Sequence, residues 1–224
     1  MWHNLEIFFG SDTHLLEQLQ TISAQVLYRS GVRIFGEGDT SDTVYYILEG
    51  SARAVRYSES GTEVWLDNFS AGNLFGEMAS LVEDRRRTAD MYALTDTTVA
   101  TLSGKAFLSL IENNGGLGHR VCRLLAARIH NTTHRMFEHA TLTATARIYA
   151  ELLRMAEPKK EFAEHSAVLI SDMLPISELA KKLSISRETV SRTVSKLKEE
   201  EILEAKGSDM AILKPQKLVS RLHH

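Results

Sequence analysis

The stretch PISELAKKLSISRETVSRTVSKLKEEEIL, residues 175–203, decides the fold of the C-terminal part of the chain. Pro175 and Ser177 are residue types that favour the start of a helix. Apolar residues at helical spacing follow, and the segment 184–186 interrupts them before a second helical segment at 187–199. Two short helices joined by a three-residue turn predict a helix-turn-helix. The expected inward positions are Ile176, Leu179, Ala180, Leu183, Val190, Val194 and Leu197.

The outward face of the second predicted helix carries side chains suited to a DNA major groove. An arginine can donate two hydrogen bonds to guanine O6 and N7, and a glutamate can accept one from cytosine N4. Serine and lysine can bond phosphates, which positions the protein without reading the sequence. We therefore predict a DNA interface made of Arg187, Glu188, Thr189, Ser191, Arg192 and Lys196, with Ser195 as a further phosphate contact.

Charge alone does not establish this interface. The chain of 224 residues has a formal net charge of -3, and residues 171–224 hold ten Lys and Arg against eight Asp and Glu, a local balance of +2. Such a modest balance leaves open an ordinary helix pair with a solvated, charged face. The DNA prediction therefore depends on the string SRETVSR at 186–192.

Between Val32 and Leu102 the pattern predicts short strands. β-Branched and aromatic runs alternate with glycine turns, and Gly50, Gly61 and Gly72 recur eleven residues apart. Strands at this spacing are typical of an antiparallel barrel or sandwich. The first thirty residues instead show leucines at three- and four-residue spacing, so we expect them to be helical.

Residues 117–138 predict one long helix of about 33 Å at 1.5 Å per residue. Its narrow stripe is typical of a helix that pairs with a second copy of itself, and packing on the chain's own barrel is the alternative. The stripe consists of Val121, Leu125, Ile129, Thr132 and Met136. Beyond it we expect a helix at 144–157, a stop at Pro158 and a charged loop at 159–165, then a strand at 167–171 and a hairpin around Gly207.

The string ISRETVSR at 185–192 resembles the recognition helix of the CRP/FNR family of bacterial transcription regulators. In that family the positions matching Arg187, Glu188 and Arg192 read a palindromic half-site, and this chain retains all three residue types. The family often has glycine in the turn where this chain has Ser184, and a left-handed serine costs about 1 kcal/mol more than glycine. The resemblance covers nearly the whole chain and implies a homodimer that contacts RNA polymerase.

This resemblance implies an α+β chain in three parts. Residues 1–115 are expected to form a jelly-roll-like β-roll that binds a cyclic nucleotide. Residues 116–141 form the long dimerisation helix, and residues 142–224 form a winged helix-turn-helix. Not every member of the family binds a cyclic nucleotide, so the pocket has to be interpreted from its own residues.

The candidate pocket lies in GNLFGEMASLVEDRRRTA, residues 72–89. A helical turn starting at Gly76 can point its N–H groups at a phosphate, and Arg87 can add a two-pronged hydrogen bond. Glu77 has no use in a simple anion pocket, but its carboxylate can accept a hydrogen bond from the free ribose hydroxyl of a 3′,5′-cyclic nucleotide. The alternative is a solvated charged loop in which Glu77 pairs with one of the neighbouring arginines.

The string FGEMA…RTA resembles the phosphate-binding cassette of the cyclic-nucleotide-sensing members. Arg128 matches a position that can pair with the pocket glutamate, and Thr132 and Thr133 match a hydroxyl pair that reaches the base, one of the two from the partner subunit. The resemblance implies a site formed by Gly76, Glu77, Met78, Ala79, Arg87, Thr88, Arg128, Thr132 and Thr133. The expected ligand is cAMP. The second choice is cGMP, because cGMP-preferring pockets outside the bacterial family often place threonine directly after the arginine, as Thr88 is here.

Several classes of protein are disfavoured. No run of apolar residues is long enough for a membrane span, and the N-terminus does not resemble a signal peptide. The single cysteine, Cys122, is expected to be buried, and it fits a reducing compartment such as the cytoplasm. His130 and His134 have a zinc-like spacing but no third ligand, so we expect exposed histidines and no metal. No catalytic triad or P-loop is found, so we expect no enzyme.

Two alternatives to a ligand-gated DNA-binding regulator remain. The first is the same fold with constitutive DNA binding or a different signal, such as redox state or a gas. The second is a cyclic-nucleotide-binding subunit that acts on a protein partner, which the sequence of the second helix disfavours.

Overall fold

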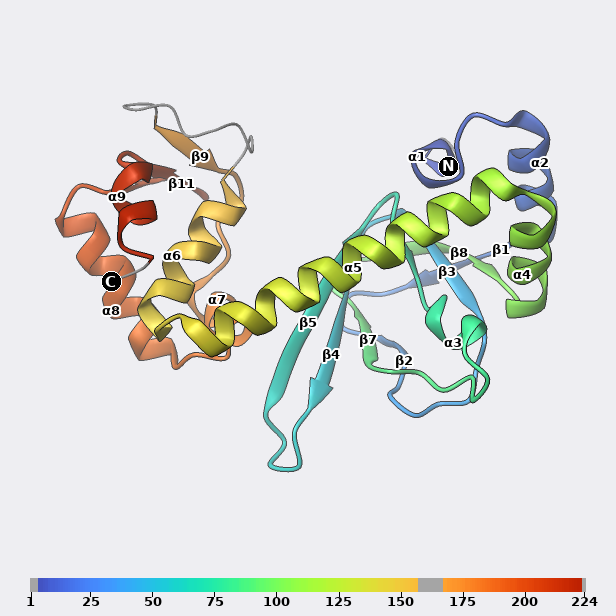
Figure 1. Ribbon diagram of the computed structural model, residues 1–224, viewed down its shortest axis with the longest axis horizontal. Helices are drawn as coiled ribbons and strands as arrows, with labels where there is room; N and C mark the ends of the chain where they lie inside the picture. The colour runs from blue at the N-terminus through green and yellow to red at the C-terminus, as the bar shows by residue number, and fades with distance from the viewer. Residues whose placement is uncertain (1–3, 157–166, 223–224) are drawn as a thin grey trace. The chain divides into compact units, whose positions relative to one another are not determined.

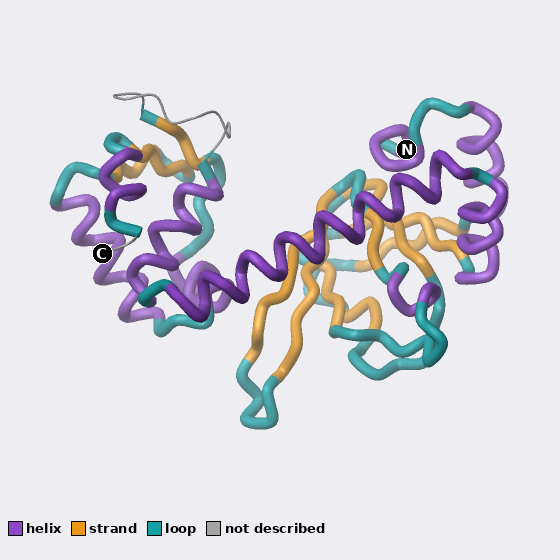
Figure 2. The backbone as a smooth tube through the Cα atoms, in the orientation of Figure 1, coloured by secondary structure: helices purple, strands orange, loops and turns teal. Residues whose placement is uncertain are grey.

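The computed structural model describes residues 4–156 and 167–222 (Figures 1 and 2). The chain divides into two compact units, residues 1–128 and 129–224. The division falls inside the long helix α5, which runs without interruption over Gly115–Thr141. The boundaries expected from the sequence, at 115/116 and 141/142, stay predictions.

The first unit is built on two antiparallel four-stranded sheets, with strand orders β1-β8-β3-β6 and β2-β7-β4-β5. This confirms the antiparallel β architecture predicted for 32–102. The strands are β1 Ala24–Tyr28, β2 Arg33–Phe35, β3 Val44–Glu49, β4 Ser51–Tyr57, β5 Glu63–Ser70, β6 Leu74–Phe75, β7 Asp90–Ala93 and β8 Thr97–Leu102. The helices are α1 Leu5–Phe9, α2 Thr13–Ile22, α3 Met78–Leu81 and α4 Gly104–Asn113, followed by the first part of α5.

The expectation that the first thirty residues are helical is wrong beyond Ile22. Helix α2 begins after Asp12, whose side chain caps its N-terminus, and ends at Ile22. Strand β1, AQVLY, then pairs antiparallel with β8 along its whole length. The leucine spacing stops at α2, and the β-branched and aromatic residues of β1 are suited to the edge of a sheet.

Strand β3 explains why the first unit holds together. Its sequence VYYIL is buried along its length because it lies between β8 and β6 and has a core on both faces. One core cluster packs Tyr46 and Leu48 against the N-terminal helices and α5, and the other packs Tyr45 and Ile47 against Phe75. Two members of the second cluster, Phe75 and Ala89, belong to the cassette at 72–89.

The long helix predicted at 117–138 is confirmed, and it is longer at both ends. Val121 is buried in the core of the first unit, whereas Ile129 and Met136 are each 68% exposed and Phe137 is 64% exposed. Cys122 is exposed, contrary to our expectation. An α-helix turns by about 100° per residue, so the neighbour of a buried residue faces sideways and away from the core.

The second unit contains the helix-turn-helix, and its two helices are confirmed as α7 Ile176–Leu183 and α8 Arg187–Glu199. Ser184 between them has the left-handed conformation, with φ 51°. The predicted strand and hairpin are also confirmed and form one sheet in the order β10-β11-β9. The remaining elements are α6 Ala144–Met155, β9 Val168–Ile170, β10 Leu203–Lys206, β11 Asp209–Ile212 and α9 Pro215–Ser220. The predicted stop at Pro158 and the loop at 159–165 lie outside the described residues.

The core of the second unit consists of the inward faces of its helices. Val190 and Leu197 are fully buried, and Val194 nearly so, as the sequence predicted. They pack with Leu179 and Ile148 in one apolar cluster. Because α8 rests on this cluster along its inner face, its opposite face is left to solvent.

Candidate functional site

Glu77 is the most deeply buried charged group of the cassette. It immediately precedes α3 and has no exposed surface. One carboxylate oxygen, Oε1, accepts a hydrogen bond from Nη1 of Arg128, which also donates from Nη2 to the Leu74 carbonyl oxygen at 2.6 Å. The other, Oε2, has no hydrogen-bond partner in the described part of the chain. The carboxylate is therefore held by α5, and not by an arginine of the loop 83–88.

Arg87 is 3% exposed and lies in a cradle of backbone oxygens. Its Nη1 donates to the Gly76 carbonyl oxygen at 2.8 Å, and its Nη2 donates to the Thr43 carbonyl oxygen at 2.7 Å and to Ser41 Oγ at 3.0 Å. Its guanidinium carbon lies 4.2 Å from the centre of the Phe35 ring. Its Nε has no partner among the described residues.

The electrostatics of Arg87 follow from this cradle. Burial lowers the pKa of its guanidinium, and the nearby Tyr45, Asp42, Asp39 and Glu77 oppose that effect. Arginine starts from so high a pKa that it keeps its charge in a protein. A buried positive charge is thus fixed in position next to a buried carboxylate.

Gly76 is required by the backbone at this point. Its φ is +76°, and a Cβ atom there would lie 2.8 Å from Arg87 Nη1 and 3.1 Å from the Thr43 carbonyl oxygen. The left-handed conformation turns the chain from β6 into α3 and brings the Gly76 carbonyl oxygen to the arginine. Only glycine adopts this conformation without strain and leaves room for the guanidinium.

The other predicted residues of the cassette divide by exposure. Ala79 is buried, whereas Met78 is 44% exposed and Thr88 is exposed. Arg85 and Arg86 are exposed, as expected. Both side chains nevertheless make contacts within the chain. Arg85 Nη1 lies 3.5 Å from Asp42 Oδ2, and Arg86 Nη1 donates to the Gly38 carbonyl oxygen at 3.2 Å.

The structure therefore gathers Gly76, Glu77, Arg87 and Arg128 in the first unit. Thr132 and Thr133 follow Arg128 by about one helical turn, are exposed and belong to the second unit, so their role stays a prediction. Our sequence reasoning missed Ser41, Thr43 and Phe35, which cradle Arg87. The glycines around 36–38 signalled only a turn there.

The face of α8 predicted to read DNA is open to solvent. The side chains of Arg187, Glu188, Ser191 and Arg192 line one shallow hollow. Among the described residues, no ion pair holds the guanidinium of either arginine. Lys196 and Ser195, farther along the helix, are also exposed.

Thr189 differs from its neighbours on this face. Ser186 Oγ caps α8 by accepting from the Thr189 backbone N–H at 3.2 Å, and the two hydroxyls lie 2.8 Å apart. The hydroxyl of Thr189 therefore takes part in the helix cap and is half-buried. Capping by serine typically stabilises a helix by about 1 kcal/mol, so Thr189 has a structural role here in addition to the predicted one.

The two histidines with a zinc-like spacing both lie on α5. His130 and His134 are both exposed, as expected. In the part of the chain that the structure describes, no group of three His, Cys, Asp or Glu side chains is placed to hold a metal ion. None of the described helices is long and apolar enough to cross a membrane.

Family models match both parts of the chain. The cyclic nucleotide-binding domain matches residues 25–114, and the Crp-like helix-turn-helix domain matches residues 146–221. The cAMP-activated global transcriptional regulator CRP of Pasteurella multocida is 28% identical over 185 residues, which are 83% of this chain and 88% of that protein.

Solved structures also match the chain. The catabolite activator protein of Thermus thermophilus is 26% identical with a TM-score of 0.54, over 96% of this chain and 97% of that one. A CooA mutant from Carboxydothermus hydrogenoformans has a TM-score of 0.80 at 17% identity, over 96% of this chain and 94% of that one, and shows the fold. The fold and the two sites thus define a DNA-binding transcription regulator with a cyclic nucleotide-binding domain. The chain belongs to the CRP/FNR family.

Proposed function

We propose that the chain acts as a homodimer that binds a palindromic DNA site under the control of a cyclic nucleotide, with cAMP as the preferred ligand. One observation carries the ligand assignment. Two buried polar atoms of the cassette, Glu77 Oε2 and Arg87 Nε, have no partner among the described residues. An unpaired buried polar atom is costly, and here one is an acceptor and the other a donor.

These two atoms match the two ends of a cyclic nucleotide. The free acceptor, Glu77 Oε2, suits the 2′-hydroxyl of the ribose. The free Nε–H of Arg87 suits the phosphodiester, because three of the five N–H groups of that guanidinium are already donated to the protein. The proposed site is formed by residues that bind the phosphate and ribose, namely Gly76, Glu77, Met78, Ala79, Arg87, Thr88 and Arg128. Thr132 and Thr133 are proposed to reach the purine base of the nucleotide.

The preference for cAMP is supported by the relatives, since the protein of Pasteurella multocida is named as cAMP-activated. The second choice is cGMP, because Thr88 directly follows the arginine and its exposed hydroxyl is available to a ligand. Activation requires that the ligand bind the DNA-competent state more tightly than the other state.

The proposed dimer uses α5. Ile129, Met136 and Phe137 are large apolar side chains that the single chain leaves exposed on this helix. Exposed apolar residues gathered on one helix favour contact with a partner, and a second copy of α5 supplies one. Each α8 would then read one half-site with Arg187, Glu188 and Arg192, while Ser191 and Lys196 contact phosphates. Contact with RNA polymerase in the cytoplasm completes the proposal.

Isothermal titration of the protein with cAMP, and then with cGMP, tests the ligand assignment. We expect saturable binding of cAMP at one or two molecules per dimer. Glu77→Gln, which keeps the shape but loses the charge, should weaken binding at least about tenfold by losing a charged hydrogen bond. Arg86→Gln, a change at the exposed neighbour of Arg87, is the control and should leave binding intact. Absence of heat with both nucleotides would contradict the assignment of a cyclic nucleotide as ligand. It would not contradict the proposed DNA binding.

A further inference from the structure

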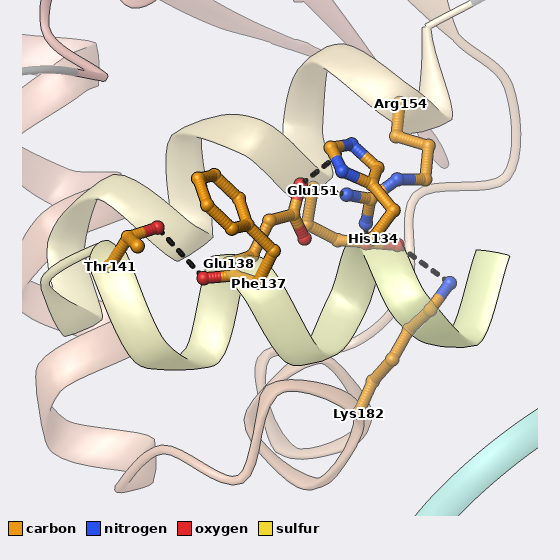
Figure 3. Close-up of polar contacts among 7 residues, drawn as sticks. All are labelled: His134, Phe137, Glu138, Thr141, Glu151, Arg154 and Lys182. Atoms are coloured by element: carbon orange, nitrogen blue, oxygen red, sulfur yellow. Dashed lines mark hydrogen bonds and ion pairs between the residues drawn. The ribbon is translucent and has the colours of Figure 1, made fainter. Parts of the chain in front are cut away.

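Four charged side chains form a continuous chain of ion pairs across three helices of the second unit (Figure 3). Glu138 of α5 accepts from Arg154 Nη2 at 2.5 Å, and Arg154 of α6 also donates from Nη1 to Glu151 Oε2. Glu151 Oε1 lies 2.6 Å from Lys182 Nζ on α7. We call Glu138, Arg154, Glu151 and Lys182 the charge chain.

Burial makes the charge chain unusual. The Glu151 side chain is 2% exposed, and those of Glu138, Lys182 and Arg154 are 13%, 19% and 31% exposed. A buried carboxylate is tolerated only when it is paired and hydrogen-bonded, and here two cations approach it from different helices. The four formal charges cancel. His134 adds a weaker contact, with Nε2 3.4 Å from Glu138 Oε1.

A second bridge links the same three helices. Arg147 of α6 donates to His139 Nδ1 on α5 at 2.6 Å and to the Leu183 carbonyl oxygen at the end of α7 at 3.3 Å. Arg147 and Arg154 are seven residues apart, about two helical turns, and so share one face of α6. Helix α6 therefore holds α5 and α7 at two points.

Apolar packing does not attach the C-terminal part of α5 to the other helices of the unit. No residue of α5 between 129 and 141 is buried, and only Arg135 and Glu138 are half-buried. The apolar core of the unit instead joins α6, α7 and α8. Apart from the backbone connection, the end of α5 is thus attached mainly by polar contacts, which are directional and fix one geometry.

We propose that the charge chain consists of positioning residues that set the orientation of α8 with respect to α5, and through it the half-site spacing that the protein accepts. Lys182 lies on α7, one residue before Leu183, and the turn 184–186 leads directly into α8. In a dimer joined through α5, the separation of the two copies of α8 sets the spacing of the half-sites. The inference rests on the proposed homodimer.

The test is selection of binding sites from a DNA library of palindromes with variable spacing between the half-sites. One base pair turns a half-site by about 34° around the DNA axis, so a rigid dimer accepts a single spacing. We expect the wild-type protein to prefer one spacing at least about tenfold over its neighbours, since a misplaced half-site loses base contacts. In Glu151→Gln and Lys182→Gln this preference should fall to about twofold or less, with the half-site sequence unchanged.

Lys181→Gln is the matched control. Lys181 lies on the same helix, is more exposed and is 3.6 Å from Glu178, so its loss removes the same charge but leaves the charge chain intact. It should weaken DNA binding slightly at all spacings and keep the preferred one. If the charge chain only stabilised the fold, Glu151→Gln and Lys182→Gln would lower the folded fraction without changing the preferred half-site spacing.

Folding is checked by circular dichroism at the temperature of the selection. Should the glutamine variants unfold, Arg154→Lys replaces them, because lysine keeps the charge but loses the fork that reaches both Glu138 and Glu151. Folded variants that select the wild-type spacing with full preference overturn the proposal. Selection of single half-sites by the wild-type protein overturns the proposed dimer and this inference with it.

Discussion

The cassette and the recognition helix use the same residue type in opposite surroundings. Arg87 is 3% exposed and donates three hydrogen bonds to its own chain, whereas Arg187 is exposed and has no ion-pair partner among the described residues. The proposed ligand pocket has to hold its charge in a space with little water, and three of the five N–H groups of Arg87 are already donated to the chain itself. An arginine that contacts DNA can stay in solvent in the free protein, because the large DNA surface displaces the water around the side chain when it binds. Loss of the arginine should therefore damage folding in one unit and affinity in the other.

The largest effect is expected from Arg87→Ala. It leaves the carbonyl oxygens of Gly76 and Thr43 without their donor, and we expect the free energy of unfolding of the first unit to fall by about 3 to 5 kcal/mol. Urea denaturation followed by tryptophan fluorescence measures it, because Trp65 is buried in this unit and the sequence has no tryptophan in residues 129–224. Arg86→Ala is the control, and an equal loss in both variants would contradict a special role for the cradle.

Arg187→Ala should have the opposite profile. We expect a loss of about 1 to 3 kcal/mol in binding to a selected palindrome for each base contact removed. The free energy of unfolding should change by less than about 0.5 kcal/mol, since the side chain is exposed. Fluorescence anisotropy with labelled palindromic and random DNA measures both affinities. The control is Lys198→Ala, on the last turn of the same helix. It should weaken binding to the palindromic and to the random DNA by the same factor.

Gly76→Ala tests the backbone of the cassette. The left-handed conformation costs about 1 to 2 kcal/mol for alanine, and the contact with Arg87 Nη1 adds to it. Gly61→Ala is a matched control, because Gly61 has φ +79° and nothing within 4 Å of the new Cβ. The difference between the two losses in urea denaturation isolates the steric contact, and equal losses would show that Arg87 moves aside freely.

Ser184→Gly tests the corresponding turn of the second unit and should act in the opposite direction. Ser184 already has φ 51°, so glycine relieves strain and is expected to stabilise the unit by up to about 1 kcal/mol. Thermal unfolding followed by circular dichroism detects the change. A lower melting temperature would mean that the serine side chain contributes more than its backbone strain costs.

Local patterns predicted most of the fold. Residues 187–199 were predicted to be a helix, and α8 has those bounds, because its apolar spacing and its serine cap are both local signals. Strand β1 was missed because its identity depends on β8, and the paired residues of the two strands are 69 to 77 positions apart in the sequence. The edge of a sheet is defined by its partner strand, and a propensity pattern of five residues does not contain that partner.

The candidate sites were predictable to different extents. Gly76, Glu77 and Arg87 lie within twelve residues of one another, and family resemblance added Arg128. The cradle of Ser41 and Thr43 was not predicted, because it reaches Arg87 across more than forty residues and mainly through backbone oxygens that any residue has. The charge chain was also missed, since only its Glu151–Arg154 pair is local, while Lys182 meets Glu151 across a second helix.

The exposure of Cys122 has a practical consequence. The sequence contains one cysteine, and it lies on the surface of α5. A nitroxide spin label that reacts with thiols would therefore attach at one place in each copy, with no engineered substitution. Pulsed electron paramagnetic resonance on an assembled pair would yield a single distribution of label-to-label distances. Its mean would locate the two helices relative to one another, and its width would show how firmly they are held.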